Sequence, residues 1–162
     1  MKTIIIYSTK YGSVEKAANM LKKKIGGDVA LVNVKKEIPP ALTPYDNIIL
    51  GGSIYVGKIQ KELSDYILAN LQTLLAKNVG LYICAAQEGE TLEKELTDSF
   101  PPELLQHARI KEAVGYELCL EKLGFFDRMA TRFIKGTKAS EYRLNETVIG
   151  KIASAFSVLK HN

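Results

Sequence analysis

Residues 3–13, TIIIYSTKYGS, join an apolar run to a turn rich in hydroxyl groups. The run Thr3–Tyr7 is β-branched and aromatic throughout, which predicts a strand buried on both faces. After the turn, Ser13–Ile25 carries apolar residues at helical spacing, with Ser13 as the expected N-cap and Gly26-Gly27 as the stop. A buried strand, a turn and a helix in this order predict the first unit of a parallel α/β sheet.

The same alternation continues along the chain. Further strands are expected at Val29–Val34, Asn47–Gly52, Val79–Ala86 and Ala113–Leu120. Further helices are expected at Gln60–Ala76, Leu92–Phe100 and Asn145–Leu159. Crossover helices between strands predict a parallel sheet with helices on both faces, a three-layer α/β sandwich. Five strands favour the order 2-1-3-4-5, in one domain that spans residues 1–162.

Composition narrows the classes of function. With 162 residues and 46% hydrophobic content, the chain can bury a core without disulfides. Cys84 and Cys119 lie in apolar runs, which indicates buried thiols in a reducing cytoplasm. The two cysteines and two histidines are not closely spaced, so no metal site is predicted. His107, expected in a polar turn after Pro101-Pro102, and His161 pair with no nucleophile, which argues against a hydrolytic triad.

The turn after the first strand is the first candidate for a binding site. In a 2-1-3-4-5 sheet, ligands bind beyond the first and third strands. The loop Ser8–Ser13 offers hydroxyls and backbone N–H groups at a helix N-terminus, a combination suited to a phosphate monoester, and Gly12 allows close approach. It matches neither the triphosphatase loop nor the dinucleotide loop. A turn of this kind is also found as a plain helix cap.

Two further loops should line the same edge of the sheet. In Gly51–Lys58, glycines flank an aromatic residue, so the loop can present backbone polar groups and a flat ring to a planar ligand. The loop Ala85–Gly89 follows the fourth strand, and Gln87 offers an amide to a ring carbonyl. As an alternative, the first of these loops is an ordinary turn with a surface tyrosine.

These motifs resemble the flavodoxin family over essentially the whole chain. The stretch IIYSTKYGS resembles the family's phosphate loop, and ILGGSIYVG resembles its first flavin loop. The resemblance implies FMN as the cofactor, and it implies that the peptide Val56–Gly57 responds to flavin reduction. The residues that it places around FMN are Ser8, Thr9, Lys10, Tyr11, Gly12, Ser13, Ser53, Ile54, Tyr55, Val56, Gly57, Ala86, Gln87, Glu88 and Gly89.

Within this family the sequence resembles most closely the flavodoxin-like, quinone-linked protoporphyrinogen oxidases. The resemblance rests on the Ser-Ile-x-x-Gly loop at Ser53–Gly57 and on the Phe-Phe-Asp-Arg-Met stretch at Phe125–Met129. It implies an FMN-dependent oxidoreductase whose partner is a quinone or a redox protein. The alternative is a soluble electron carrier without a substrate of its own. A pI near 8.9 and a loop Ala85–Gly89 without aromatic residues depart from short carriers, and that loop is shorter than in the oxidases.

Two other classes of protein share this sheet order. A phosphoryl-accepting signalling domain needs clustered acids after the first strand to bind magnesium, whereas this chain has Ser8-Thr9 there. A domain of this fold that only binds a partner and holds no cofactor is another alternative. A visible absorption spectrum distinguishes it from a flavoprotein. No nucleic-acid partner is predicted.

The segment Lys122–Lys138 carries the whole net charge of +4, with five cations against one acid. At helical spacing it has an apolar stripe and a cationic face, formed by Arg128, Arg132 and Lys135. One interpretation is an ordinary amphipathic helix packed on the sheet. The other is a helix that lies on an anionic membrane, where a quinone is found. The second predicts a cytoplasmic protein with peripheral contact at the inner face of the membrane.

Overall fold

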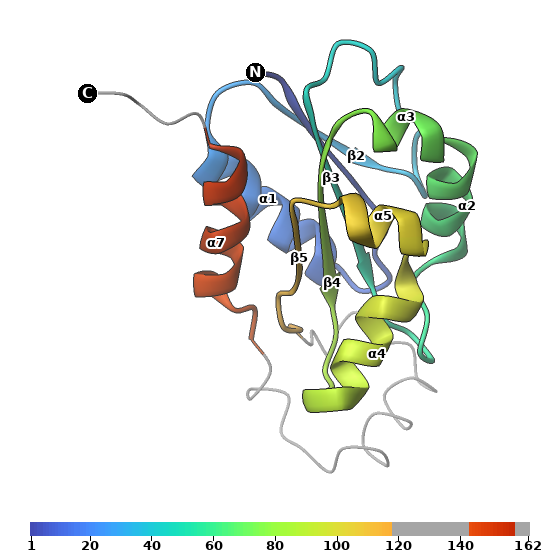
Figure 1. Cartoon of the computed structure of the whole chain (residues 1–162). Helices are drawn as coiled ribbons and strands as arrows, with labels where there is room; N and C mark the ends of the chain where they lie inside the picture. Colours follow the sequence, from blue (N-terminus) through green and yellow to red (C-terminus); the bar gives the residue numbers. More distant parts are fainter. Residues whose placement is uncertain (118–142, 158–162) are drawn as a thin grey trace.

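The computed structural model describes residues 1–117 and 143–157. Its sheet has five parallel strands in the order β2-β1-β3-β4-β5, which confirms the predicted fold class (Figure 1). The strands are β1 (Thr3–Tyr7), β2 (Val29–Asn33), β3 (Asn47–Ser53), β4 (Asn78–Cys84) and β5 (Ile110–Ala113). Cys119, Lys122–Lys138 and the predicted end of the last helix lie outside the described residues.

The centre of the sheet is buried on both faces because β1 and β3 have helices above and below them. Every residue of these two strands is buried. Tyr7 pairs in register with Gly51, so both strands end at the same edge. The continuous apolar run of residues 3–7 therefore has the structure that its composition predicted.

Helices cover the two faces of the sheet in separate layers (Figure 1). On one face, α1 (Ser13–Ile25) and α7 (Glu146–Phe156) pack on Ile5 and Ile49. On the other face, Ile4 and Ile6 share a core cluster with residues of α2 (Lys61–Ala69) and α5 (Pro102–His107). The helices shown on that side are α2 (Lys61–Ala69), α3 (Leu71–Leu75), α4 (Gly89–Ser99) and α5 (Pro102–His107). None of the helices within residues 1–117 and 143–157 is long and apolar enough to span a membrane.

Several helix boundaries differ from the prediction. The single helix expected over Gln60–Ala76 is divided at Asn70, whose φ of −116° leaves the helical range and whose side chain donates to Tyr66 O. Residues 102–107 form helix α5 instead of a turn, because Pro102 at its first position suits a helix start. The helix α4 begins at Gly89 rather than Leu92, and α7 is N-capped by Asn145, which accepts from Val148 N.

The position of the fifth strand was predicted wrongly. The strand pairs Ile110–Ala113 with β4, whereas the apolar run predicted Ala113–Leu120. An edge strand needs only one buried side, so β5 tolerates the charged residues Lys111 and Glu112. The ladder ends near Gly115, which has a φ of +83° and accepts a hydrogen bond from Ala85 N.

Candidate functional site

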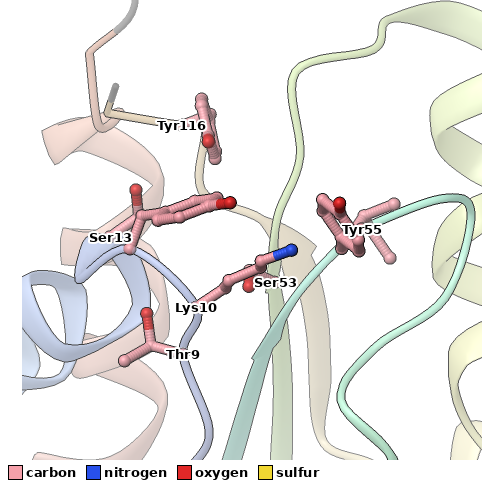
Figure 2. Close-up of a pocket in the computed structure, with 8 residues that line it drawn as sticks. Thr9, Lys10, Ser13, Ser53, Tyr55 and Tyr116 are labelled. Carbon is pink, nitrogen blue, oxygen red and sulfur yellow. The ribbon is translucent and has the colours of Figure 1, made fainter. Parts of the chain in front are cut away.

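The loops after β1 and β3 meet at the carboxyl edge of the sheet, as the strand order requires. The amide of Ser8 donates to Gly51 O over 3.1 Å and holds the two loops together at their base. Between them lies a small pocket (Figure 2). Its lining residues are Thr9, Lys10, Tyr11, Ser13, Ser53, Ile54, Tyr55 and Tyr116. Most of these residues were predicted around the cofactor, and the first two loops therefore form one site.

The first loop turns into α1 through Gly12, which has a φ of +96° and occupies the N-cap position. Thr9 Oγ1 accepts from Gly12 N over 2.9 Å, so the threonine side chain fixes the turn. The first helical bond runs from Lys16 N to Gly12 O, which leaves the first-turn N–H groups of α1 without a partner in the helix. The prediction of Ser13 as N-cap is wrong, because the left-handed turn needs a glycine one residue earlier.

Two hydroxyls that were predicted to bind the phosphate form hydrogen bonds with other groups of the protein. Ser8 is fully buried, and its Oγ donates to Glu62 Oε1 over 2.8 Å, on the α2 side of the sheet. Ser13 Oγ donates to Glu117 O over 2.7 Å and accepts from Glu117 N over 3.2 Å. Thr9 Oγ1 is the acceptor in the bond from Gly12, and within residues 1–117 and 143–157 no acceptor takes its hydroxyl proton.

The second loop is anchored by Gln60, a residue that the sequence did not single out. Gln60 Oε1 accepts from Ser53 N over 3.1 Å. Its Nε2 donates to Ser53 O over 3.1 Å and to Ser53 Oγ over 2.7 Å. A single side chain thus satisfies the backbone and hydroxyl of the residue at which β3 ends, which sets the direction of the loop.

A tight turn at Tyr55–Lys58 presents the aromatic ring. The backbones of Tyr55 and Lys58 exchange two hydrogen bonds across Val56 and Gly57. Both central residues have positive φ, 52° for Val56 and 75° for Gly57, as in a type I′ turn. This conformation is strained for a β-branched residue such as Val56. The turn leaves Tyr55 43% exposed at the mouth of the pocket.

Two more tyrosines line the pocket. Tyr11 belongs to the first loop, and its hydroxyl is buried without a hydrogen-bond partner among the described residues. Tyr116 follows β5 and was not predicted as a site residue, because its segment was assigned to a strand. Burial raises the pKa of Tyr116, and the Lys10 ammonium opposes the shift. Three aromatic rings and buried polar groups therefore surround one small space.

The third predicted loop lies at the same edge but does not line this pocket. Gln87 and Glu88 are exposed after the end of β4, and Gly89, with a φ of +62°, starts α4. The pocket is completed instead by Tyr116.

Other side chains of reactive types do not contribute to this pocket. Cys84 is fully buried, and burial raises the pKa of its thiol well above the ordinary value, which makes it inert. His107 Nε2 lies 2.6 Å from Lys77 O, and neither residue lines the pocket. Within residues 1–117 and 143–157, no cluster of histidines, cysteines and acids is suited to a metal ion.

The arrangement suits a ligand with an anionic group and a flat ring. The anionic group matches the helix N-terminus and the Gly12 turn, and the ring matches the tyrosine walls. The buried hydroxyl of Tyr11 has no hydrogen-bond partner among the described residues, and a polar atom of a ligand can supply one.

Comparisons with known proteins agree with this geometry. Residues 4–144 match the family model described as a flavodoxin domain. A comparison with curated protein sequences found no match.

Solved structures give the same fold. The chain is similar to a short-chain flavodoxin associated with a non-canonical PDU bacterial microcompartment, with 15% identity, a TM-score of 0.58, and coverage of 96% of this chain and 97% of that one. It is similar to oxidised Flavodoxin 1 from Bacillus cereus, with 13% identity, a TM-score of 0.55, and coverage of 100% and 99%.

A larger enzyme contains a similar unit. The rubredoxin:oxygen oxidoreductase of Desulfovibrio gigas is 18% identical, with a TM-score of 0.50 over 96% of this chain. The chain spans only 36% of that protein's length. Because the family model covers most of the chain, this protein belongs to the flavodoxin domain family.

Proposed function

We propose that this protein binds FMN at the carboxyl edge of the sheet and acts as a redox flavoprotein. The observation that carries the proposal is the pocket itself. The Gly12 turn at the α1 N-terminus and the tyrosine-lined loop after β3 lie on its two sides. The prediction of FMN is supported by membership of the flavodoxin domain family.

In this proposal the first loop holds the phosphate and the tyrosines hold the ring. Thr9 donates its hydroxyl proton to a phosphate oxygen, and the first-turn amides of α1 face the same anion. Tyr55 and Tyr116 enclose the isoalloxazine, and Gln60 keeps Ser53 in place below it. The loop Ala86–Gly89 lies at the outer edge of the site. Bound flavin supplies one- and two-electron chemistry, while the protein supplies position and electrostatics.

We further propose an oxidoreductase rather than a soluble electron carrier. The basic character of the chain and the lack of aromatic residues in Ala85–Gly89 support this choice. The narrower assignment, an enzyme like the flavodoxin-type protoporphyrinogen oxidases, is supported by the sequence resemblance at Ser53–Gly57 and Phe125–Met129. The second of these stretches lies outside the described residues.

The proposed partner is a quinone or a redox protein. The charge of Lys122–Lys138 supports a cytoplasmic protein with peripheral contact to an anionic membrane surface. This segment follows β5 in the sequence, and β5 ends at the edge of the sheet that carries the pocket.

Two measurements test the proposal. Boiling the purified protein and chromatographing the released flavin identifies the cofactor. We expect FMN, because only one loop suits a phosphate, and predominantly FAD would contradict the assignment. Anaerobic reduction followed by reoxidation with quinone, with and without protoporphyrinogen, then tests the activity. Renewed reduction of the bound flavin by protoporphyrinogen, with quinone as the acceptor, supports the oxidase, whereas reoxidation by quinone that protoporphyrinogen does not change supports a carrier.

A further inference from the structure

The hydroxyl of Tyr11 is an unsatisfied polar group at the pocket. Tyr11 lines the pocket, and its Oη is buried without a hydrogen-bond partner among the described residues. Two other tyrosines show the usual arrangement. Tyr7 Oη donates to Glu15 Oε1 over 2.8 Å, and Tyr82 Oη donates to Val14 O over 3.0 Å. Buried polar groups are paired in this way in the great majority of cases, so the hydroxyl of Tyr11 requires an explanation.

The unpaired hydroxyl destabilises the folded chain. A buried donor without an acceptor loses its hydrogen bonds with water and gains none in the protein. A phenylalanine at position 11 would keep the aromatic ring and avoid this loss. Packing alone therefore does not account for a tyrosine here, and the hydroxyl indicates a polar partner that enters the pocket from outside the chain.

The position of Tyr11 in the first loop indicates which part of a ligand it meets. Tyr11 directly precedes Gly12, whose turn opens the N-terminus of α1, where an anionic group is favoured. The hydroxyl is separated from this turn by the length of the tyrosine ring. In a phosphate ester, the groups at such a distance from the phosphate belong to the chain that carries it. In FMN this chain is a ribityl group, whose hydroxyls both donate and accept hydrogen bonds.

We propose that the hydroxyl of Tyr11 binds the ribityl chain of FMN, between the phosphate and the ring. The inference rests on the proposed function, and it assigns a residue to the part of FMN that the Gly12 turn and the other tyrosines do not hold. Water does not reach the hydroxyl in this structure, so the ligand has to part Tyr11 from its neighbours as it enters. The new hydrogen bond offsets part of that displacement, and Tyr11 thereby selects flavins that carry the polyol chain.

The experiment compares Tyr11→Phe with the control Tyr7→Phe. The control removes the same hydroxyl group from a residue that does not line the pocket and whose hydroxyl has a partner. Fluorescence titration of the flavin-free protein gives the dissociation constants for FMN, riboflavin and lumiflavin. Riboflavin lacks the phosphate, and lumiflavin carries a methyl group in place of the ribityl chain. The midpoint of urea unfolding of the flavin-free protein reports its stability.

We expect Tyr11→Phe to weaken the binding of FMN and of riboflavin about tenfold each, because a ribityl hydroxyl then loses its partner. The affinity for lumiflavin should change less than about twofold, since lumiflavin makes no contact with the hydroxyl. The urea midpoint should rise, because the variant no longer buries an unpaired hydroxyl. Tyr7→Phe should lower the midpoint, since it removes the bond to Glu15, and should keep the ratio of the three affinities.

A loss of affinity confined to FMN overturns the proposal, because Tyr11 then serves the phosphate. An equal loss for all three flavins also overturns it, because the change then acts on the ring or on the pocket as a whole. Unchanged affinities for FMN and riboflavin, or a midpoint that does not rise in Tyr11→Phe, contradict it as well. Failure of the wild-type protein to bind any of the three flavins overturns the proposed function itself, so the two failures are distinguishable.

Discussion

Replacing Gln60 by alanine tests whether its contacts with Ser53 hold the second loop in place. The change removes three hydrogen bonds, of 3.1, 3.1 and 2.7 Å. Each neutral bond contributes about 1 kcal/mol, and freeing the glutamine returns roughly 1 kcal/mol of side-chain entropy. We therefore expect the free energy of unfolding to fall by about 2 kcal/mol. Because the loop also presents Tyr55, the affinity for FMN should fall about tenfold.

Urea unfolding of the flavin-free protein measures the stability change, with an unchanged slope as the sign of two-state behaviour. Gln72→Ala is the matched control, since Gln72 is exposed on α3 and should stay within about 0.5 kcal/mol of wild type. Gln60→Glu keeps the acceptor for Ser53 N but replaces the amide donor with an oxygen, so it should destabilise at least as much as alanine. If Gln60→Ala behaves like Gln72→Ala, the three bonds do not stabilise the loop and the reasoning fails.

The remaining predictions concern the core, the phosphate and the membrane. Gly51→Ala would place Cβ 2.1 Å from Cζ of Tyr82, so urea unfolding should show a loss of about 3 kcal/mol, whereas Gly150→Ala, in open space on α7, should stabilise by about 0.5–1 kcal/mol. Thr9→Ala should cost about 1.5–3 kcal/mol in FMN binding but little in riboflavin binding, as measured by fluorescence titration; equal losses would mean that the hydroxyl is only a structural cap. The protein should sediment with anionic but not neutral vesicles at low salt, because each cation near an anionic surface contributes about 1 kcal/mol to binding. Replacing the cations on the cationic face of Lys122–Lys138 by glutamine should abolish this sedimentation. Equal sedimentation with both lipids would contradict a role for that charge.

The sequence predicted the architecture because its signals are local. The apolar run at Thr3–Tyr7 and the helical spacing in Ser13–Ile25 depend only on neighbouring residues, and both elements have the predicted bounds. The alternation of strands and helices restricts the topology to a parallel sheet, and the strand order places the two loops together. The strand order also predicted that the loops after the first and third strands meet, and the pocket lies between these two loops.

The roles of the individual side chains in the site depend on contacts between distant parts of the chain. Ser8 bonds to Glu62 and Ser13 to Glu117, partners that lie 54 and 104 residues away in the chain. Tyr116 lines the pocket because β5 pairs earlier than its apolar residues suggested. Such contacts form because the sheet brings segments that are distant in the sequence to one edge. A local pattern of residues does not show which distant residue will become the partner. The sequence therefore determined which edge of the sheet forms the site, and the packing of the strands determined which atoms face into it.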